Sequence, residues 1–246
     1  MTLDSLEIKE RKDSILGIAV EEYIQTILPV SSSFIAGRYL LDLSSATIRN
    51  ILAELEEDGY LIQPHASAGR IPTEKGYRYY VDNLMNEIKL LEEEKRRIKE
   101  EYNREKLELE QLLDKTSRCL SELTHYTGIV SVDGWNHKFF CRGTNLIIDY
   151  PDYPKDLNKI KNILTALDQK ESLLKVINKN LAGRIDILIG HEITCREIES
   201  CSLVVSSYKL KDGLSGRMAV LGPTRMDYER VVSALDYFSQ LMEEMF

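Results

Sequence analysis

The sequence predicts an α+β protein, because a helix-rich first half is followed by strands and helices that do not strictly alternate. In the first half, apolar residues recur at helical spacing, as in Ile15, Ala19, Tyr23 and Ile27. After Thr127 the pattern changes to runs that are typical of strands. These runs are TGIVSV, KFFCRGTNLI, RIDILIG, CSLVVSSYKL and GRMAVLG. We therefore expect a helical N-terminal domain and a mixed C-terminal domain.

The N-terminal segment follows the order helix, helix, tight turn, helix, hairpin, which is that of a winged helix-turn-helix domain. Pro29 ends the first helix, since proline lacks a backbone donor, and Gly59 supplies a stop for the third. Ser45 is expected to cap the third helix, and Thr73 the helix after the hairpin. The predicted elements are helices over residues 7–28, 34–41 and 46–58 and strands over residues 60–63 and 70–72.

From Glu74 to Leu123 the pattern stays helical, with apolar residues recurring about every 3.5 residues. It predicts one long amphipathic helix with an imperfect heptad seam, because Lys95, Glu105 and Thr116 occupy seam positions. Such a helix either packs on its neighbouring domain or forms a dimeric coiled coil, and the polar seam positions favour packing. The apolar seam residues are Leu84, Ile88, Leu91, Ile98, Tyr102, Leu109, Leu112 and Leu123.

The C-terminal part is predicted to hold two helical pieces within residues 155–180 and a closing helix over residues 224–245. Lys211-Asp212-Gly213 suits a hairpin turn between two of the strands. The expected domains are a winged helix-turn-helix over residues 1–83, a long linking helix over 84–124 and an α+β domain over 125–246.

The composition limits the classes of function. The N-terminus, MTLDSLEIKERKDS, lacks the apolar segment of a secretory signal, and no apolar run is long enough to span a bilayer. Four scattered cysteines without a CxxC pair favour a reduced, cytoplasmic setting. The net charge of −8 argues against non-specific attraction to nucleic acid, so DNA binding must rest on local geometry.

The third predicted helix has the pattern of a recognition helix. Its apolar residues fall on one face, which must point into the core, while Ala46, Asn50 and Ala53 lie opposite, flanked by Thr47 and Arg49. Asparagine and arginine can each make two hydrogen bonds to a base edge, and arginine can instead bind a phosphate. Acidic residues crowd the far end, so only the N-terminal half is expected to dock. Ser45 lies at its start.

The hairpin adds positive charge beside this helix. Arg70, Lys75 and Arg78 surround its end and the start of the next helix, and Gly69 is expected to let the backbone approach a phosphate. The alternative is an ordinary solvated hairpin, and the 13 acidic against 8 basic residues in segment 1–85 favour that alternative.

Other residue patterns do not indicate a reaction. His191, Glu192, Cys195 and Cys201 match no zinc-site spacing, and a polar loop between strands is the better interpretation. The sequence contains no P-loop, nucleophile elbow or HExxH motif. We therefore expect no enzyme activity, no cofactor and no metal.

The stretch SSATIRNILAELEEDGYLIQPHASAGRIPTEKGYRYYVDNL closely resembles the N-terminal domain of the HrcA family of bacterial heat-inducible transcription repressors. SLVVSSYKLKDGLSGRMAVLGPTRMDYERVV resembles the other end of that family, and LTHYTGIV and RGTNLI fit between. The resemblance covers most of the chain and keeps its order.

The resemblance implies a repressor that binds an inverted-repeat operator upstream of chaperonin and chaperone genes and is released on heat shock. It also implies a GAF-like C-terminal domain without an established cofactor, and help from the GroEL chaperonin. By position, it places Thr47, Arg49 and Asn50 on the recognition helix. It places on or beside the wing His65, Ser67, Arg70 and Lys75.

The sequence departs from the family in one respect. Family members usually carry a dimerisation segment inserted into the GAF-like domain, whereas only VDGWNHKFF separates the first strand from RGTNLI here. An inverted-repeat operator demands a two-fold dimer, so the long helix 74–123 and the winged domains are expected to provide the homodimer contact. Two rival functions remain open, a regulator whose GAF-like domain senses a small ligand and a winged domain used for protein contacts.

Overall fold

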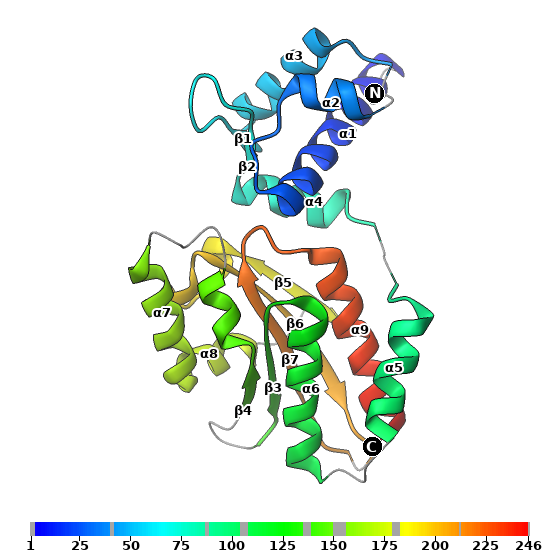
Figure 1. The fold of residues 1–246 in the computed structure, drawn as a ribbon, viewed down its shortest axis with the longest axis vertical. Coiled ribbons are helices and arrows are strands. Elements are labelled where there is room, and N and C mark those ends of the chain that lie inside the picture. The colour runs from blue at the N-terminus through cyan, green and yellow to red at the C-terminus, as the bar shows by residue number, and fades with distance from the viewer. Residues whose placement is uncertain are drawn as a thin grey trace. The chain divides into compact units, whose positions relative to one another are not determined.

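The computed structural model describes residues 3–39, 42–86, 89–103, 108–134, 139–149, 156–178, 183–211 and 213–245. The chain divides into two compact units, Met1–Asn86 and Glu87–Phe246, here called unit 1 and unit 2 (Figure 1). None of the helices in the described ranges combines the length and apolar character that a membrane span requires.

Unit 1 has the predicted order of helices and hairpin. Its elements are α1 (Leu3–Thr26), α2 (Ser32–Arg38), α3 (Ser45–Glu57), β1 (Leu61–Ile62), β2 (Ile71–Pro72) and α4 (Glu74–Asn83). The two short strands pair antiparallel, and Val30 adds a third partner by bridging to Arg70. Fully buried Ile15, Ile48 and Leu61 join α1, α3 and β1 in one core. The predicted two-stranded hairpin therefore has a third pairing, which ties it to the segment after α1.

Several helix boundaries differ from the prediction, and three of them bear on the expected stops and caps. α1 ends at Thr26, three residues before Pro29. The cap of α3 is Ser44 and not Ser45, because the helix begins one residue earlier than expected, and the Ser44 hydroxyl accepts the Thr47 N–H at 3.1 Å. α2 ends at Arg38, and the last residues of the predicted span, 40 and 41, lie outside the described residues. Thr73 caps α4 as predicted, with its hydroxyl accepting the Gly76 N–H.

The single long helix over residues 74–123 is wrong. The segment forms α4, α5 (Glu92–Asn103) and α6 (Leu109–Thr124), and Glu108 starts α6 by donating its N–H to the Gln111 side chain at 3.1 Å. Tyr102 of α5 donates to the Thr116 hydroxyl of α6 at 2.8 Å, so α5 folds back beside α6. Burial of Tyr102 and Leu112 within unit 2 therefore outweighs the local preference for one continuous helix. Ile88 and Glu105 lie outside the described residues.

Unit 2 is built on a five-stranded antiparallel sheet with the order β4-β3-β7-β6-β5. Its strands are β3 (Thr127–Val132), β4 (Phe139–Arg142), β5 (Ile185–Ile189), β6 (Cys201–Lys209) and β7 (Ser215–Pro223). β6 and β7 form a hairpin in which Lys209 faces Ser215. Gly213 adopts a φ of 90° in the predicted turn, where glycine avoids a steric penalty, while Asp212 lies outside the described residues.

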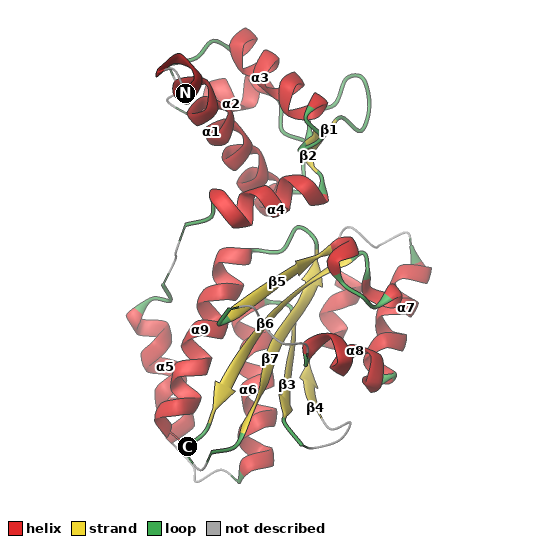
Figure 2. Ribbon diagram, turned by 180° about the vertical axis from the view of Figure 1, so that it is seen from behind, coloured by secondary structure: helices red, strands yellow, loops and turns green. Residues whose placement is uncertain are grey.

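Helices cover both faces of this sheet (Figure 2). On one face, Ser206 of β6 forms a hydrogen bond with Ser239 of α9 (Tyr228–Met245), and α6 packs on β3. On the other face, Leu203 and Val205 join a buried apolar cluster with residues of the two helices that span residues 157–168 and 170–177. The elements that complete unit 2 are η1 (Thr144–Asp149), α7 (Leu157–Asp168), α8 (Lys170–Ile177), η2 (Gly190–Glu192), η3 (Arg196–Ile198) and α9 (Tyr228–Met245). The predicted α+β class is confirmed.

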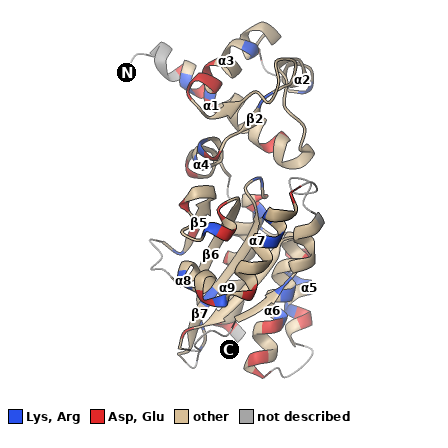
Figure 3. Ribbon diagram, turned by 90° about the vertical axis from the view of Figure 1, so that its left-hand side faces the viewer, with Lys and Arg blue, Asp and Glu red and all other residues tan. Residues whose placement is uncertain are grey.

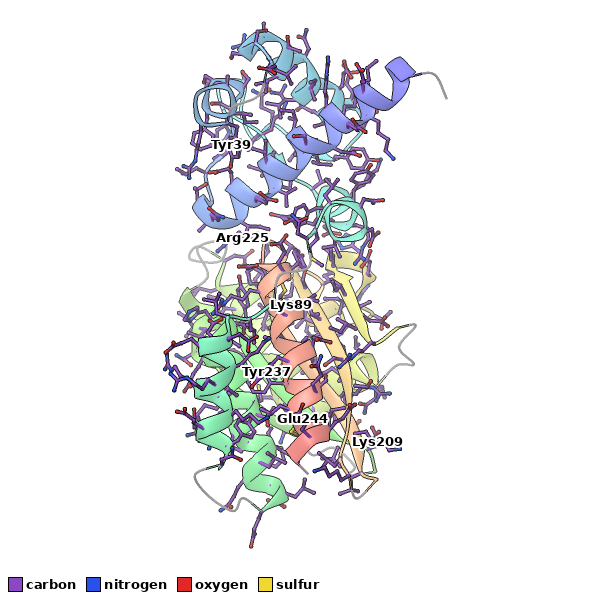
Figure 4. The ribbon with its side chains drawn as sticks, turned by 90° about the vertical axis from the view of Figure 1, so that its right-hand side faces the viewer. Tyr39, Lys89, Lys209, Arg225, Tyr237 and Glu244 are labelled. Atoms are coloured by element: carbon purple, nitrogen blue, oxygen red, sulfur yellow. The ribbon has the colours of Figure 1, made fainter. Side chains whose placement is uncertain are left out.

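α5 docks onto α9 within unit 2. Glu94 accepts from the Arg230 guanidinium at 2.7 Å, and Tyr237 donates to the Lys95 carbonyl at 2.8 Å. Lys99 forms an exposed ion pair with Glu244 at 3.1 Å. Glu244, which is labelled in Figure 4, lies near the C-terminal end of α9. The Arg230 hydrogen bond holds the pKa of Glu94 below its ordinary value. These contacts pack part of the segment predicted as one long helix against the protein's own last helix.

Candidate nucleic-acid interface

α3 presents two opposite faces. Ile48, Ile51, Leu52 and Leu55 are buried, as its periodicity predicts. The other face is exposed in unit 1 along the first two turns, at Ala46, Thr47, Arg49 and Asn50, while Ala53 is half-buried. Figure 3 shows the charges on the ribbon, and α3 holds a single basic residue, Arg49. The exposed face therefore combines small residues with one cation and one amide.

Arg49 and Asn50 are available for external contacts. Within the described part of the chain, neither side chain makes a hydrogen bond or an ion pair. The Thr47 hydroxyl lies 2.9 Å from the Ser44 hydroxyl, which holds it at the first turn. Ser45 points elsewhere, since its hydroxyl contacts the Ser32 hydroxyl at 3.4 Å and links α3 to α2. The residues suited to base or phosphate contacts are thus Thr47, Arg49 and Asn50.

The acidic end of α3 is partly neutralised by contacts inside unit 1. Lys12 of α1 lies 2.8 Å from Glu54 and 3.5 Å from Asp58, and its hydrogen bond with Glu54 raises the pKa of Lys12. Arg70 pairs with Glu56 at 3.0 Å. Because these carboxylates have cationic partners, the repulsion expected between the C-terminal half of α3 and DNA is reduced.

The wing, residues 61–72, is shaped by its own polar groups. The Gln63 amide donates to the Ala66 and Ala68 carbonyls at 3.2 and 2.8 Å. His65 and Ser67 are exposed at its tip. A Cβ on Gly69 would lie 2.5 Å from the Val30 carbonyl carbon, so glycine is needed for packing inside the protein. Approach to a phosphate, which the sequence suggested for Gly69, is not required to explain it.

Known proteins identify the family to which this arrangement belongs. A family model described as the HrcA protein C terminal domain matches residues 131–232. The heat-inducible transcription repressor HrcA of Symbiobacterium thermophilum is 30% identical over 337 residues, which covers 97% of this chain and 98% of that relative. The chain belongs to the HrcA family of heat-inducible transcription repressors.

A second HrcA, from Moorella thermoacetica, is 30% identical over 344 residues, covering 98% of this chain and all of the relative. Both alignments are longer than the 246 residues present here, so these HrcA proteins contain segments that have no counterpart in this chain. A protein described as hypothetical, of known crystal structure, shares the fold with a TM-score of 0.77 at 19% identity, over 95% of this chain and 97% of its own.

Within this HrcA-family chain, the basic residues expected at the wing are engaged internally. Lys75 donates to the Asp58 carbonyl at 2.6 Å and lies 4.5 Å from the centre of the Tyr60 ring. Arg78 pairs with Asp82 one turn further along α4, at 3.0 Å. Together with the Arg70–Glu56 pair, these contacts give each predicted wing cation a partner in unit 1. Lys75 thereby ties α4 to the end of α3, and Arg70 ties the hairpin to the same helix, whereas the Arg78 pair lies within α4.

Two features of this surface escaped the sequence analysis. From sequence, Glu56 is one of the acidic residues at the end of the helix, and Gln63 is the last residue of a predicted strand. In the structure, Glu56 accepts the Gln63 N–H and the Gln63 amide donates within the wing loop, so both shape the wing. On α2, half-exposed Arg38 lies 5.5 Å from the Phe34 ring centre and 3.4 Å from a buried Glu22 oxygen. Charge pattern alone identifies neither, because the polar partners of Glu56 and Arg38 come from other elements.

The residues that the sequence analysis weighed as metal ligands make other contacts in the structure. Among the residues described, no group of three or more His, Cys, Asp or Glu side chains is arranged to hold an ion. Cys195 instead donates to Glu197 at 3.2 Å, and burial raises the pKa of this thiol to about 11. His191 and Glu192 fall in η2, where Glu192 accepts the Ile189 N–H at 2.8 Å.

Proposed function

We propose that unit 1 is the operator-binding domain and that α3 docks its first two turns in the major groove of duplex DNA. One observation carries this proposal. Arg49 and Asn50 are exposed beside Thr47, their side chains make no hydrogen bond or ion pair with the described residues, and the opposite face of the helix is buried. Arginine and asparagine are suited to guanine and adenine edges, and the N-terminal turns add a favourable dipole for phosphate.

We further propose that the wing lies against the sugar-phosphate backbone beside α3. His65 and Ser67 are exposed polar residues at its tip, and Lys75 and Arg78 border it from α4. The operator is an inverted repeat, which calls for a symmetric homodimer. Unit 2 then supplies regulation and association rather than catalysis, and the setting is the cytoplasm.

The first test is a binding-site selection on the purified full chain, followed by gel shifts on the selected repeat at several salt concentrations. If Arg49 reads a base, Arg49→Ala should weaken operator binding by about 1–3 kcal/mol and relax the preference at one position. If it binds phosphate, affinity should fall on all sequences and the salt slope should shrink by about one.

Glu57→Gln is the matched control, because Glu57 is exposed on the last turn of the same helix. The affinity of this variant for the operator should not fall, because the substitution removes a negative charge from the C-terminal end of α3, which stays outside the groove. Operator binding by Arg49→Ala that equals the wild type in affinity, preference and salt slope would refute the proposed interface.

The family resemblance extends the proposal to control by heat and by the GroEL chaperonin. We expect purified chain held at heat-shock temperature to lose operator binding, and added GroEL with ATP to restore it after cooling. The measurement is the active fraction in a stoichiometric gel shift. Equal recovery with and without GroEL would remove the chaperonin from the proposal while leaving the DNA interface intact.

A further inference from the structure

The Arg70 side chain joins the wing to the far end of α3. Its Nε donates to Glu56 Oε2 at 3.0 Å, and only 14% of the side chain is exposed. Glu56 lies on the last turn of α3, 14 positions earlier in the chain. An arginine that is so enclosed has already lost much of its hydration and is paired with a carboxylate. It would therefore gain less free energy from binding a phosphate than an exposed arginine would.

The second oxygen of Glu56 extends the connection into the wing. Glu56 Oε1 accepts the backbone N–H of Gln63 at 3.1 Å. The Gln63 amide in turn donates to two carbonyls of the loop, those of Ala66 and Ala68. One carboxylate on α3 thus binds both sides of the hairpin, through Gln63 on the outgoing side and Arg70 on the returning side.

The backbone of Arg70 fixes the same point from another direction. Arg70 and Val30 exchange both N–H···O hydrogen bonds, each 2.9 Å long. Gly69 packs directly on this segment, with no room for a Cβ. The wing is therefore held against the segment after α1 by backbone pairing and against α3 by the Glu56–Arg70 ion pair.

We propose that Arg70 is a positioning residue for DNA binding, which sets the wing relative to α3 through Glu56 and does not bind phosphate. This inference rests on the proposed function of α3 and the wing as the operator interface. Preorganisation of the wing spares the complex the cost of ordering the loop on binding. Glu56, although acidic and close to the interface, then favours operator binding.

Two variants of equal length separate positioning from phosphate contact. In Arg70→Gln, the amide nitrogen stands the same number of bonds from Cα as the Nε of arginine. It keeps the donor to Glu56 and removes the charge. Arg70→Met has similar reach but no donor. Positioning predicts that Arg70→Gln keeps most of the affinity, that Arg70→Met loses about tenfold, and that neither changes the salt slope.

A measurement without DNA gives an independent readout. The Ala68 N–H donates to the His65 carbonyl at 2.9 Å within the wing loop, so its hydrogen exchange reports the order of the wing. Arg70→Met should speed exchange at this amide in the free full chain, and Arg70→Gln should leave it at the wild-type rate. Far-UV circular dichroism checks that both variants remain folded.

Each remaining outcome has a definite meaning. Equal losses of affinity in both variants would overturn the inference, and salt slopes smaller by about one would identify a phosphate contact as the cause. Wild-type affinity and exchange in Arg70→Met would also overturn it. If Arg49→Ala were silent, the proposed interface would fail instead, while the exchange experiment would still decide whether Arg70 orders the wing.

Discussion

At the scale of single residues, Gly69 shows how closely the wing is packed. Its absent side chain leaves room for the backbone of Pro29 and Val30, whose atoms would lie 2.5–2.6 Å from a Cβ. Gly69→Ala should therefore lower the free energy of unfolding of unit 1 by about 1–3 kcal/mol, because backbone must move to admit the methyl group. Urea unfolding of the full chain, monitored by hydrogen exchange at amides of unit 1, measures the change.

Gly37→Ala provides the matched comparison, since a Cβ at that position of α2 would meet no described atom within 4 Å beyond its chain neighbours and the backbone of its own helix. There the substitution should be neutral or slightly stabilising, because alanine has the higher helix propensity. Equal stability of Gly69→Ala and the wild type would mean that the wing can separate from Val30 at no cost.

Residue-level prediction from sequence succeeded where periodicity decides the answer. The helical spacing of apolar residues in α3 correctly divided buried Ile48 and Leu52 from exposed Arg49 and Asn50. The partners of Arg70 and Lys75 could not be predicted, because Glu56 and the Asp58 carbonyl approach them only after the hairpin folds back. Composition records the number of charges, whereas their availability depends on tertiary contacts.

At the scale of elements, α4 is fixed to α1 by a hydrogen bond from Tyr79 to Asp13 of 2.8 Å. Burial, followed by this hydrogen bond, raises the pKa of Tyr79 to about 12 from the ordinary value of 10.0. Because the folded-state pKa is the higher one, the associated stability is fully present below pH 10 and is lost as the pH rises toward 12.

Tyr79→Phe should therefore cost about 1–2 kcal/mol of unfolding free energy at neutral pH. The difference from the wild type should shrink between pH 10 and 12, because the Tyr79 hydroxyl of the unfolded wild type ionises there while the folded one does so only near pH 12. Urea titrations at a series of pH values measure both curves. A constant difference across this range would show that the hydrogen bond is not the source of the stabilisation.

The elements also show where local pattern misleads. The seam through residues 84–123 is apolar at helical spacing, and α5 and α6 follow it separately. Its break was not predicted, because the partners that bury Tyr102 and Leu112 lie within unit 2 and include α9. The strands were easier, since TGIVSV coincides with β3, three of the other runs each contain one strand, and GRMAVLG lies within β7.

At the scale of the whole molecule, the proposed operator complex contains two copies of the chain. Analytical ultracentrifugation of the protein with a DNA holding both half-sites should give two chains per duplex, and a DNA with one half-site should bind far more weakly. The reason is that linked half-sites make the second binding event intramolecular. One chain per full-length operator at saturation would contradict the symmetric arrangement.

The internal pairing of cations in unit 1 also bears on how such a repressor would search a chromosome. Lys12, Arg70 and Arg78 lie against carboxylates of the protein itself, so few positive charges remain to displace counterions from arbitrary DNA. Affinity for random sequence should then be low, and little repressor would be sequestered along the genome. Discrimination would come from base edges, and occupancy of the operator would vary only gently with intracellular ionic strength.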